Sequence, residues 1–281
     1  MKNIGININT DKDISRNILD KIFQYIHEEC SEAKIKVFYD SKGLDNEESR
    51  ALDAVMVLGG DGTILGTARA LAKYDVPIFG INRGHLGFLA EIELEDCKKA
   101  IKNLFKGQYK IEDRIMLKCD LKGIDKKDDF LALNDIVLTK GNLSRIVKYS
   151  IYVDNVWYTT FVADGVIVAT PTGSTAYSLS AGGPIVYPDL DVLEIAPICP
   201  HSLGIRPILL NGNSKINIRV LKKYEDPVLT IDGQRYKKVT VNEVTISKSE
   251  YKCRLIKFKD KDYFKILRTK ISYRSRECEG E

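Results

Sequence analysis

The stretch Val55-Met56-Val57-Leu58-Gly59-Gly60-Asp61-Gly62-Thr63 decides the fold of the first part of the chain. An apolar run of strand length leads directly into three glycines around one carboxylate, and a helical pattern follows from Ile64. A strand that turns through glycines into a helix presents backbone N–H groups to a phosphate, because glycine permits close approach and a helix start leaves donors unpaired. We therefore expect this loop to bind phosphate.

Asp61 is the unusual residue of the loop, because an anion does not help to hold a phosphate. We interpret it as acting on a hydroxyl group or on a metal ion. The alternative is a plain tight turn, since Asp and Gly are common turn residues, and the motif alone does not decide between the two. The chain has no Gly-Lys dipeptide, which excludes a Walker A loop, and Leu65 stands where a dinucleotide fingerprint requires its third glycine.

Strands and helices alternate on both sides of this loop. The hydrophobic pattern predicts strands at 3–9, 34–39, 54–58 and 76–81, and helices at 13–30, 64–71 and 94–105. This order predicts an α/β domain over residues 1–110, with a doubly wound, Rossmann-like parallel sheet. Ligands of such sheets bind at the carboxyl ends of the strands, where the loops at 59–63 and 82–89 fall.

The second part of the chain contains strand-like runs joined by short turns, at 114–121, 129–138, 145–153, 156–161, 165–169, 215–221, 227–231, 238–246 and 251–258. They predict a mostly antiparallel all-β domain over residues 111–266. The polar C-terminal tail, 267–281, has no placement fixed by the sequence, and packing back on the N-terminal domain is one option.

Composition narrows the class of protein. The chain has 281 residues, 44% of them hydrophobic and 29% charged, with a net charge of +4, which is typical of a soluble globular protein. Basic residues are interspersed with acidic ones, so we expect no nucleic-acid partner. Six scattered cysteines without a C-x-x-C pair, and a start without a signal peptide, favour free thiols and a cytoplasmic location. The uncharged segment 165–188 is rich in Gly, Pro, Ser and Thr, so we interpret it as a folded site and expect no membrane partner.

Three polar segments interrupt the strands of the second part. Asn134-Asp135 breaks an apolar run, as a ligand-binding pair or, alternatively, as a bulge or turn. The segment 170–184 is dense in small and hydroxyl residues, which predicts a ligand pocket: Tyr177 offers a face for a base, and Ser180 or Thr175 a hydrogen bond to its edge. Its alternative is a Ser/Thr-rich helix start and loop. Asp232-Gly233-Gln234 predicts a hairpin turn.

Together these motifs resemble the NAD kinase family. The resemblance extends in order and spacing from about residue 55 to residue 235 and rests on Gly59 to Thr63, Gly80-Ile81-Asn82 with 84–89, Asn134-Asp135, Asp164-Gly165, 170–184, 200–203 with Arg206-Pro207, and Asp232-Gly233-Gln234. The Gly-Gly-Asp-Gly loop is shared with diacylglycerol and sphingosine kinases and with phosphofructokinases. The run from Thr170 to Pro184 is specific to the NAD kinases.

The resemblance implies phosphorylation of the 2′-hydroxyl on the adenosine ribose of NAD, giving NADP, with ATP or another phosphate donor and a divalent metal ion, Mg²⁺. In this reading Asp61 is catalytic and accepts the hydroxyl proton, and Gly60, Gly62 and Thr63 shape the donor-phosphate loop. The dinucleotide would be held by Phe88, Asn134, Asp135, Arg145, Asp164, Thr175, Ala176, Tyr177, Ser178, Leu179, Ser180 and Gln234. Within this set, Phe88 is expected against the adenine and Asp164 at the nicotinamide-riboside half. A homodimer or homotetramer through the β domain is also implied.

The sequence departs from the family pattern at three of these positions. The family usually has Asn-Glu where this chain has Asn134-Asp135, so the carboxylate reaches one methylene less far. Val162 stands at a position that is often basic, and Arg145 lies at a variable one. The preferred donor, the use of NADH and the metal ligands stay open.

Two rival functions are considered. A lipid kinase with the same loop is disfavoured, because no basic amphipathic segment suggests docking to a membrane. A non-catalytic dinucleotide sensor would be expected if Asp61 were replaced, and it is present.

Overall fold

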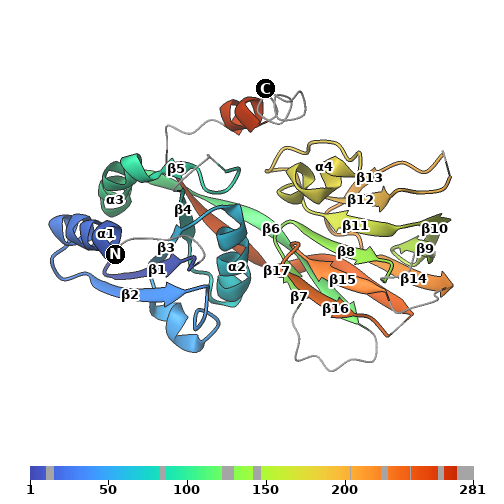
Figure 1. The fold of residues 1–281 in the computed structure, drawn as a ribbon, viewed down its shortest axis with the longest axis horizontal. Coiled ribbons are helices and arrows are strands. Elements are labelled where there is room, and N and C mark those ends of the chain that lie inside the picture. The colour runs from blue at the N-terminus through green and yellow to red at the C-terminus, as the bar shows by residue number, and fades with distance from the viewer. Residues whose placement is uncertain are drawn as a thin grey trace. The chain divides into compact units, whose positions relative to one another are not determined.

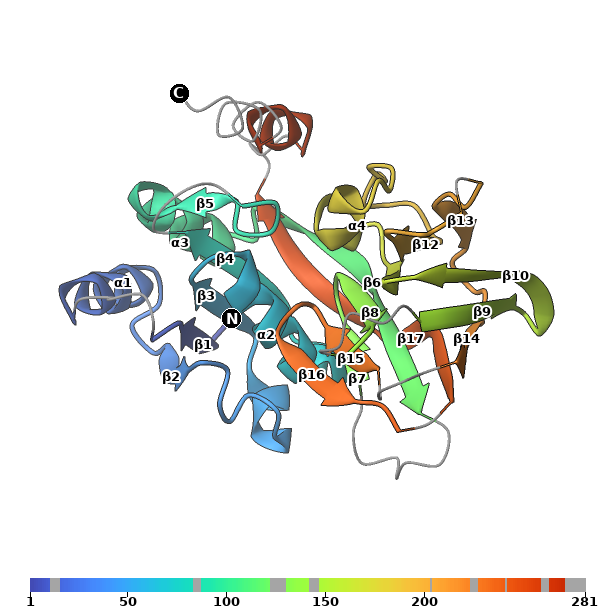
Figure 2. The ribbon, with the colours of Figure 1, turned by 45° about the vertical axis from the view of Figure 1, so that its right-hand side comes forward.

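A computed structural model describes residues 1–10, 16–82, 87–121, 130–141, 147–202, 204–222, 227–240, 242–258 and 263–270. The chain divides into two compact units, Met1–Asp113 with Cys253–Glu281 (unit 1) and Arg114–Lys252 (unit 2). The chain enters unit 2 through strand β6 (Tyr109–Leu121) and leaves it through strand β17 (Glu243–Phe258) (Figures 1 and 2). Unit 1 is therefore discontinuous in sequence.

Unit 1 contains a parallel sheet with the order β4-β3-β1-β2. Its strands are β1 (Asn3–Ile8), β2 (Lys34–Tyr39), β3 (Ala54–Leu58) and β4 (Ile78–Asn82), and both the short β5 (Ile92–Glu93) and Leu255 of β17 pair with β4. The α-helices are α1 (Arg16–Glu29), α2 (Asp61–Leu71) and α3 (Cys97–Phe105), with short 3-10 helices at η1 (Glu47–Ala51), η2 (Ala72–Tyr74) and η3 (Leu94–Asp96).

Helices cover both faces of this sheet, because successive strand side chains point to opposite sides. On one face Ile4 and Met56 share a core with Ile22 of α1 and Ile101 of α3. Helix α2 lies on the other face (Figure 1). It packs so closely that a Cβ on Gly80 would lie 2.3 Å from Ile64 Cδ1. The doubly wound α/β fold predicted from the sequence is confirmed.

Unit 2 consists of antiparallel strands in two sheets. One has the order β13-β12-β11-β8-β15-β16, and the other runs β10-β9-β14-β17, with β6 paired to β7. The bounds are β7 Phe130–Ala132, β8 Asp135–Thr139, β9 Val147–Val153, β10 Val156–Ala163, β11 Gly165–Ala169, β12 Val192–Ile198, β13 Ile208–Asn211, β14 Ile216–Lys222, β15 Val228–Ile231 and β16 Arg235–Lys238.

The two sheets of unit 2 enclose one apolar core. Tyr149 and Ile218 reach it from one sheet, and Ile136 and Val168 from the other. The opposite face of the six-stranded sheet carries Val137 and the elements that build a pocket, including the 3-10 turn η4 (Gly173–Thr175) and the one-turn helix α4 (Tyr177–Ser180). The predicted antiparallel β domain is confirmed.

Several element boundaries differ from the predictions. The runs predicted at 238–246 and 251–258 fall within or beside one 16-residue strand, β17, and the run at 129–138 is divided into β7 and β8 before Asp135. Strands β12 and β13 were not predicted, because Glu194 and Pro197 interrupt the apolar pattern of β12. Residues 263–270 are helical, and in the part of the chain described above no helix is long and apolar enough to cross a membrane.

Candidate functional site

The glycine-rich loop of unit 1 joins β3 directly to α2. The N–H groups of Thr63 and Ile64 both donate to the Gly60 carbonyl, which begins the helix. A Cβ on Gly59 would lie 2.3 Å from Thr63 Oγ1, so only glycine fits against this first turn. The same hydroxyl accepts a hydrogen bond from Asn9 Nδ2 at 3.2 Å, which ties the loop to the end of β1.

The Asp61 carboxylate accepts three backbone hydrogen bonds from a segment of unit 1 that sequence reasoning did not connect to it. Phe88 N–H donates to Oδ2 at 2.9 Å, and Leu89 and Ala90 N–H donate to Oδ1 at 3.1 and 3.0 Å. A Cβ on Gly87 would lie only 2.0 Å from Oδ1, so the close approach requires glycine there. A carboxylate offers about four acceptor positions, and the described residues occupy two on Oδ1 and one on Oδ2.

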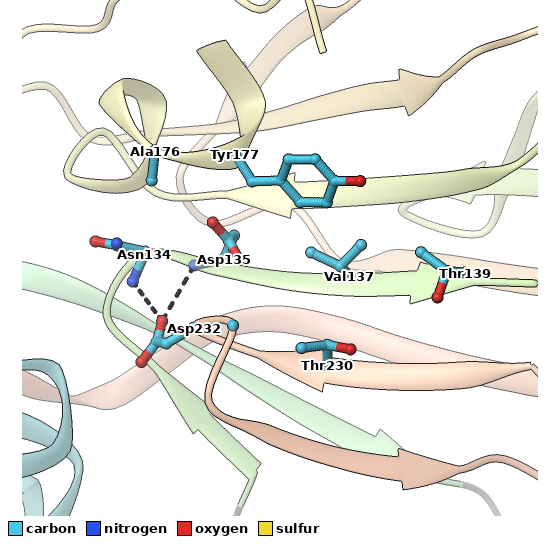
Figure 3. A pocket seen from close by; sticks show the side chains of 9 residues that line it. Asn134, Asp135, Val137, Thr139, Ala176, Tyr177, Thr230 and Asp232 are labelled. Carbon is cyan, nitrogen blue, oxygen red and sulfur yellow. Dashed lines mark hydrogen bonds between the residues drawn. The ribbon is translucent and has the colours of Figure 1, made fainter. Parts of the chain in front are cut away.

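Unit 2 contains a pocket of about 320 Å³ between α4, β8 and the turn after β15 (Figure 3). It brings together four of the residues that the sequence predicted, Asn134, Asp135, Ala176 and Tyr177. The Tyr177 ring remains 45% exposed. Alternation along β8 places Asp135, Val137 and Thr139 on the pocket face, and the remaining lining residues are Thr230, Asp232 and Gly233.

Asp232 holds the Asn134-Asp135 pair in place (Figure 3). Its carboxylate accepts the N–H groups of Leu133, Asn134 and Asp135 at 3.2, 2.7 and 3.2 Å, and its own N–H donates to the Asp135 carbonyl at 3.0 Å. Asp232 and Gly233 have φ of 50° and 65°, as in a type I′ turn, so the predicted hairpin turn is confirmed. The positioning role of Asp232 was missed, because its partners are remote in sequence.

The Asp135 carboxyl is buried at the base of the pocket. Burial, and then the nearby charge of Asp232, raise its pKa to about 7, while a hydrogen bond from the Tyr177 backbone opposes the shift. Such a carboxyl is neutral in mildly acidic solution and ionises near neutral pH. It also links β8 to the start of α4.

The hydroxyl groups of residues 170–175 mainly form hydrogen bonds with backbone groups of the protein. Thr170 Oγ1 donates to the Leu133 carbonyl at 2.6 Å, and Ser174 Oγ donates to the Pro171 carbonyl at 2.7 Å and accepts Val186 N–H at 2.9 Å. The Thr175 hydroxyl donates to the Thr172 carbonyl at 3.3 Å. These hydrogen bonds therefore fix the conformation of the loop, and Ala176 and Tyr177 follow at its end.

Comparison with known proteins identifies the family. The family model described as ATP-NAD kinase N-terminal domain matches residues 1–109, and the one described as ATP-NAD kinase C-terminal domain matches residues 133–258. The chain belongs to the NAD kinase family. It is accordingly an enzyme, a kinase.

Individual NAD kinases resemble the chain over its full length. An NAD kinase of Clostridium botulinum (strain 657 / Type Ba4) is 99% identical over 281 residues, 100% of both chains, and one of Clostridium tetani is 50% identical, covering 96% of this chain and 99% of the relative. Among solved structures, yeast NADH kinase complexed with NADH has a TM-score of 0.84 at 26% identity, covering 97% of this chain and 88% of that one. An NAD kinase from Archaeoglobus fulgidus in complex with ATP has a TM-score of 0.79 at 28% identity, covering 96% and 98%.

The other residues that the NAD kinase resemblance selected lie outside the pocket lining. Ser178 is fully buried, Leu179 is half-buried and Ser180 is exposed. Asp164 forms an ion pair with Lys140 at 2.7 Å, and Gln234 is exposed at the end of the type I′ turn. Phe88 is half-buried in unit 1, and Arg145 lies outside the described residues.

Metal ligands of this NAD kinase were left open by the sequence. Within the described ranges, no group of three or more His, Cys, Asp or Glu residues is placed to hold a metal ion.

Proposed function

We propose that the chain transfers the terminal phosphoryl group of ATP, or of another donor, to the 2′-hydroxyl on the adenosine ribose of NAD, with Asp61 as the proton acceptor. The observation that carries the proposal is the position of Asp61: it begins helix α2 within the glycine-rich loop, and the described residues occupy one acceptor position on its Oδ2. Kinship with NAD kinases supports the choice of substrate.

In this mechanism the ribose oxygen forms a bond to the terminal phosphorus as the bond from that phosphorus to the leaving nucleotide breaks. The hydroxyl proton passes to Asp61 Oδ2. A hydroxyl is a poor nucleophile, and catalysis of phosphoryl transfer consists mainly of positioning and charge stabilisation. The backbone donors of Leu89 and Ala90 fix Oδ1, so the carboxylate is oriented before the substrate binds. Gly60, Gly62 and Thr63 leave the backbone accessible to the donor phosphates.

The pocket of unit 2 is the proposed NAD site. The Tyr177 ring offers a face for the adenine, and Asn134 and Asp135 offer hydrogen bonds to the sugar hydroxyls. Thr175, Ser178 and Leu179 would hold the segment that carries Tyr177 in position without contacting NAD through the pocket lining. Phe88, Ser180, Asp164, Gln234 and Arg145 keep the roles that the family resemblance implies, Asp164 at the nicotinamide-riboside half.

Mg²⁺ is proposed to enter with the donor, because hard phosphate oxygens are its preferred ligands. It would neutralise the charge that otherwise repels the donor phosphates from Asp61.

We also propose a homodimer or homotetramer, assembled through the β domain in the cytoplasm. Support comes from the exposed apolar residues after the β9–β10 turn, where Val156 and Trp157 are 70% and 60% exposed. Such a group is typical of an association surface. Light scattering of the purified protein tests the assembly, and a monomer at micromolar concentration would contradict it.

The function is tested by measuring NADP formation from NAD with ATP, other nucleoside triphosphates and polyphosphate, each with and without Mg²⁺. A parallel incubation with labelled ATP replaces NAD by diacylglycerol or sphingosine. We expect NADP from the wild type and no labelled lipid. Tight NAD binding without NADP under every donor and metal would instead favour the sensor, and a labelled lipid would favour the lipid kinase.

A further inference from the structure

A buried carboxyl lies behind the wall of the pocket and has no part in the proposed mechanism. Glu194, on β12, is 1% exposed, and its nearest polar neighbour is the Ser178 hydroxyl of α4. A Cβ on Gly183 would lie 2.0 Å from Glu194 Oε1 and 2.4 Å from Ser178 Oγ, so both oxygens face the same space beside that glycine. By strict distance and angle criteria neither group has a hydrogen-bond partner within the described ranges, and Ser178 is the hydroxyl that influences the pKa of Glu194.

The surroundings of Glu194 favour its neutral, proton-donating form. It pairs across the sheet with Ala169 of β11 and Leu209 of β13. Neither of these strands, nor α4, contains a Lys, Arg or His residue. The titratable groups on the neighbouring segments are Tyr177 on α4 and the acidic Asp189 and Asp191 before β12, and Lys248 forms an ion pair with Asp191 at 2.8 Å. Burial raises the pKa of Glu194, and the hydrogen bond with Ser178 opposes this shift.

The Ser178 hydroxyl is the hydrogen-bonding group next to Glu194, and a hydroxyl can donate to a carboxylate or accept from a neutral carboxyl. Ser178 also takes part in the cap that closes α4 after its last residue, Ser180. Gly183 N–H donates to the Ser178 carbonyl at 2.9 Å and Gly182 N–H to the Leu179 carbonyl at 3.1 Å, with φ of +86° at Gly182, which is a Schellman motif. The carboxyl therefore contacts both ends of the loop that closes this helix.

Helix α4 is one turn long, and a helix of this length is not stable by its own hydrogen bonds. Its two sides have different surroundings. Ser178 is fully buried toward Glu194, whereas the preceding Tyr177 lines the pocket. Any shift of Ser178 is transmitted to Tyr177 through one peptide unit.

We propose that Glu194 is a positioning residue for NAD binding, which shares a hydrogen bond with Ser178 and so holds Tyr177 at the wall of the pocket. This role rests on the proposed function, in which Tyr177 binds the dinucleotide. Glu194 acts through α4 and does not touch the substrate, so its loss weakens NAD binding and leaves the phosphoryl-transfer step intact.

The test compares two substitutions of similar size. Glu194→Gln keeps a donor and stays uncharged, and Glu194→Met fills the space without a donor. We expect Glu194→Met to raise the KM for NAD and the Kd for NAD by calorimetry about tenfold, with kcat and the KM for ATP within about twofold of wild type. Glu194→Gln restores wild-type values at pH 7. Ser178→Ala has the same effect as Glu194→Met, and the double variant is no worse than either single one.

Three outcomes would each overturn the role of Glu194. The first is a folded Glu194→Met protein with the wild-type Kd for NAD, and the second is a Glu194→Met protein that loses only kcat. The third is a double variant whose loss equals the sum of the losses of Glu194→Met and Ser178→Ala. If Glu194→Met does not fold, Ser178→Ala decides by the same measures. Failure of the wild type itself to bind NAD would overturn the proposed function, and this role with it.

Discussion

The backbone N–H of Phe88 donates a hydrogen bond to the Asp61 carboxylate at 2.9 Å. The proposed proton acceptor and the residue expected against the adenine are thus directly connected within unit 1. A change in the carboxylate therefore alters the position of the segment 87–90 as well as the chemistry, and a substitution at Asp61 has two separable consequences.

Asp61→Asn is expected to lower kcat by about 10²–10⁴-fold, the range typical of a lost general base. It also replaces an acceptor with an NH₂ group that faces backbone donors, which costs about 1–3 kcal/mol of unfolding free energy. NADP formation and urea unfolding measure the two effects. The exposed Asp45→Asn in the same unit is the matched control and should change neither. Near-normal turnover of Asp61→Asn would remove Asp61 from the mechanism.

Gly87→Ala tests the same contact from the other side. The added methyl would lie 2.0 Å from Asp61 Oδ1, so either the carboxylate or the segment must move. We expect kcat to fall by at least about tenfold, since small misplacements of a catalytic group are costly. Gly204→Ala, where no atom lies within 4 Å of the added methyl, is the control. Equal activity of the two variants would show that the contact does not matter for turnover.

Asp232→Asn is expected to weaken the hydrogen bonds that position Asn134 and Asp135. The backbone N–H groups of these residues donate to the Asp232 carboxylate, and in Asn one of the two accepting oxygens is replaced by an NH₂ donor. The expected loss is about 1–3 kcal/mol of unfolding free energy, with a raised KM for NAD. Removal of the Asp232 charge should also lower the pKa of Asp135. Thermal unfolding and NAD titrations measure these effects against Asp189→Asn, an exposed acidic position. An unchanged KM for NAD would argue against the positioning role of Asp232.

The raised pKa of Asp135 predicts a pH dependence of stability. Its pKa is about 7 in the folded protein and near 3.8 as a model value, so between these values the folded state binds more protons than the unfolded state. Stability contributed by this group is full below about pH 4 and falls as pH rises through 7. Urea unfolding should show the wild type losing free energy relative to Asp135→Asn across this window. A difference that is constant with pH would contradict the burial argument.

Local pattern was enough to predict the β3–loop–α2 unit, because hydrophobic periodicity and glycine spacing are properties of adjacent residues. It was not enough for β12, where a buried Glu194 stands in the strand, or for the joined strand β17. The partners of Asp61 lie 27 to 29 residues away, and those of Asp232 lie 97 to 99 residues away. Such contacts have no local signal. Composition indicated a pocket at 170–184, but only the structure shows that hydroxyl groups such as that of Thr175 bond inward.

The strand pairing of Leu255 beside Ile78 has a consequence for biosynthesis. Unit 1 takes its last strand from a part of the chain that follows the whole of unit 2. Synthesis proceeds from the N-terminus, so β4, although paired with β5 at Ile81 and Asn82, lacks its β17 neighbour at Ile78 until the intervening β domain has been translated. Nascent chains arrested before residue 253 should consequently expose the β4 edge to proteolysis, whereas released full-length chains protect it.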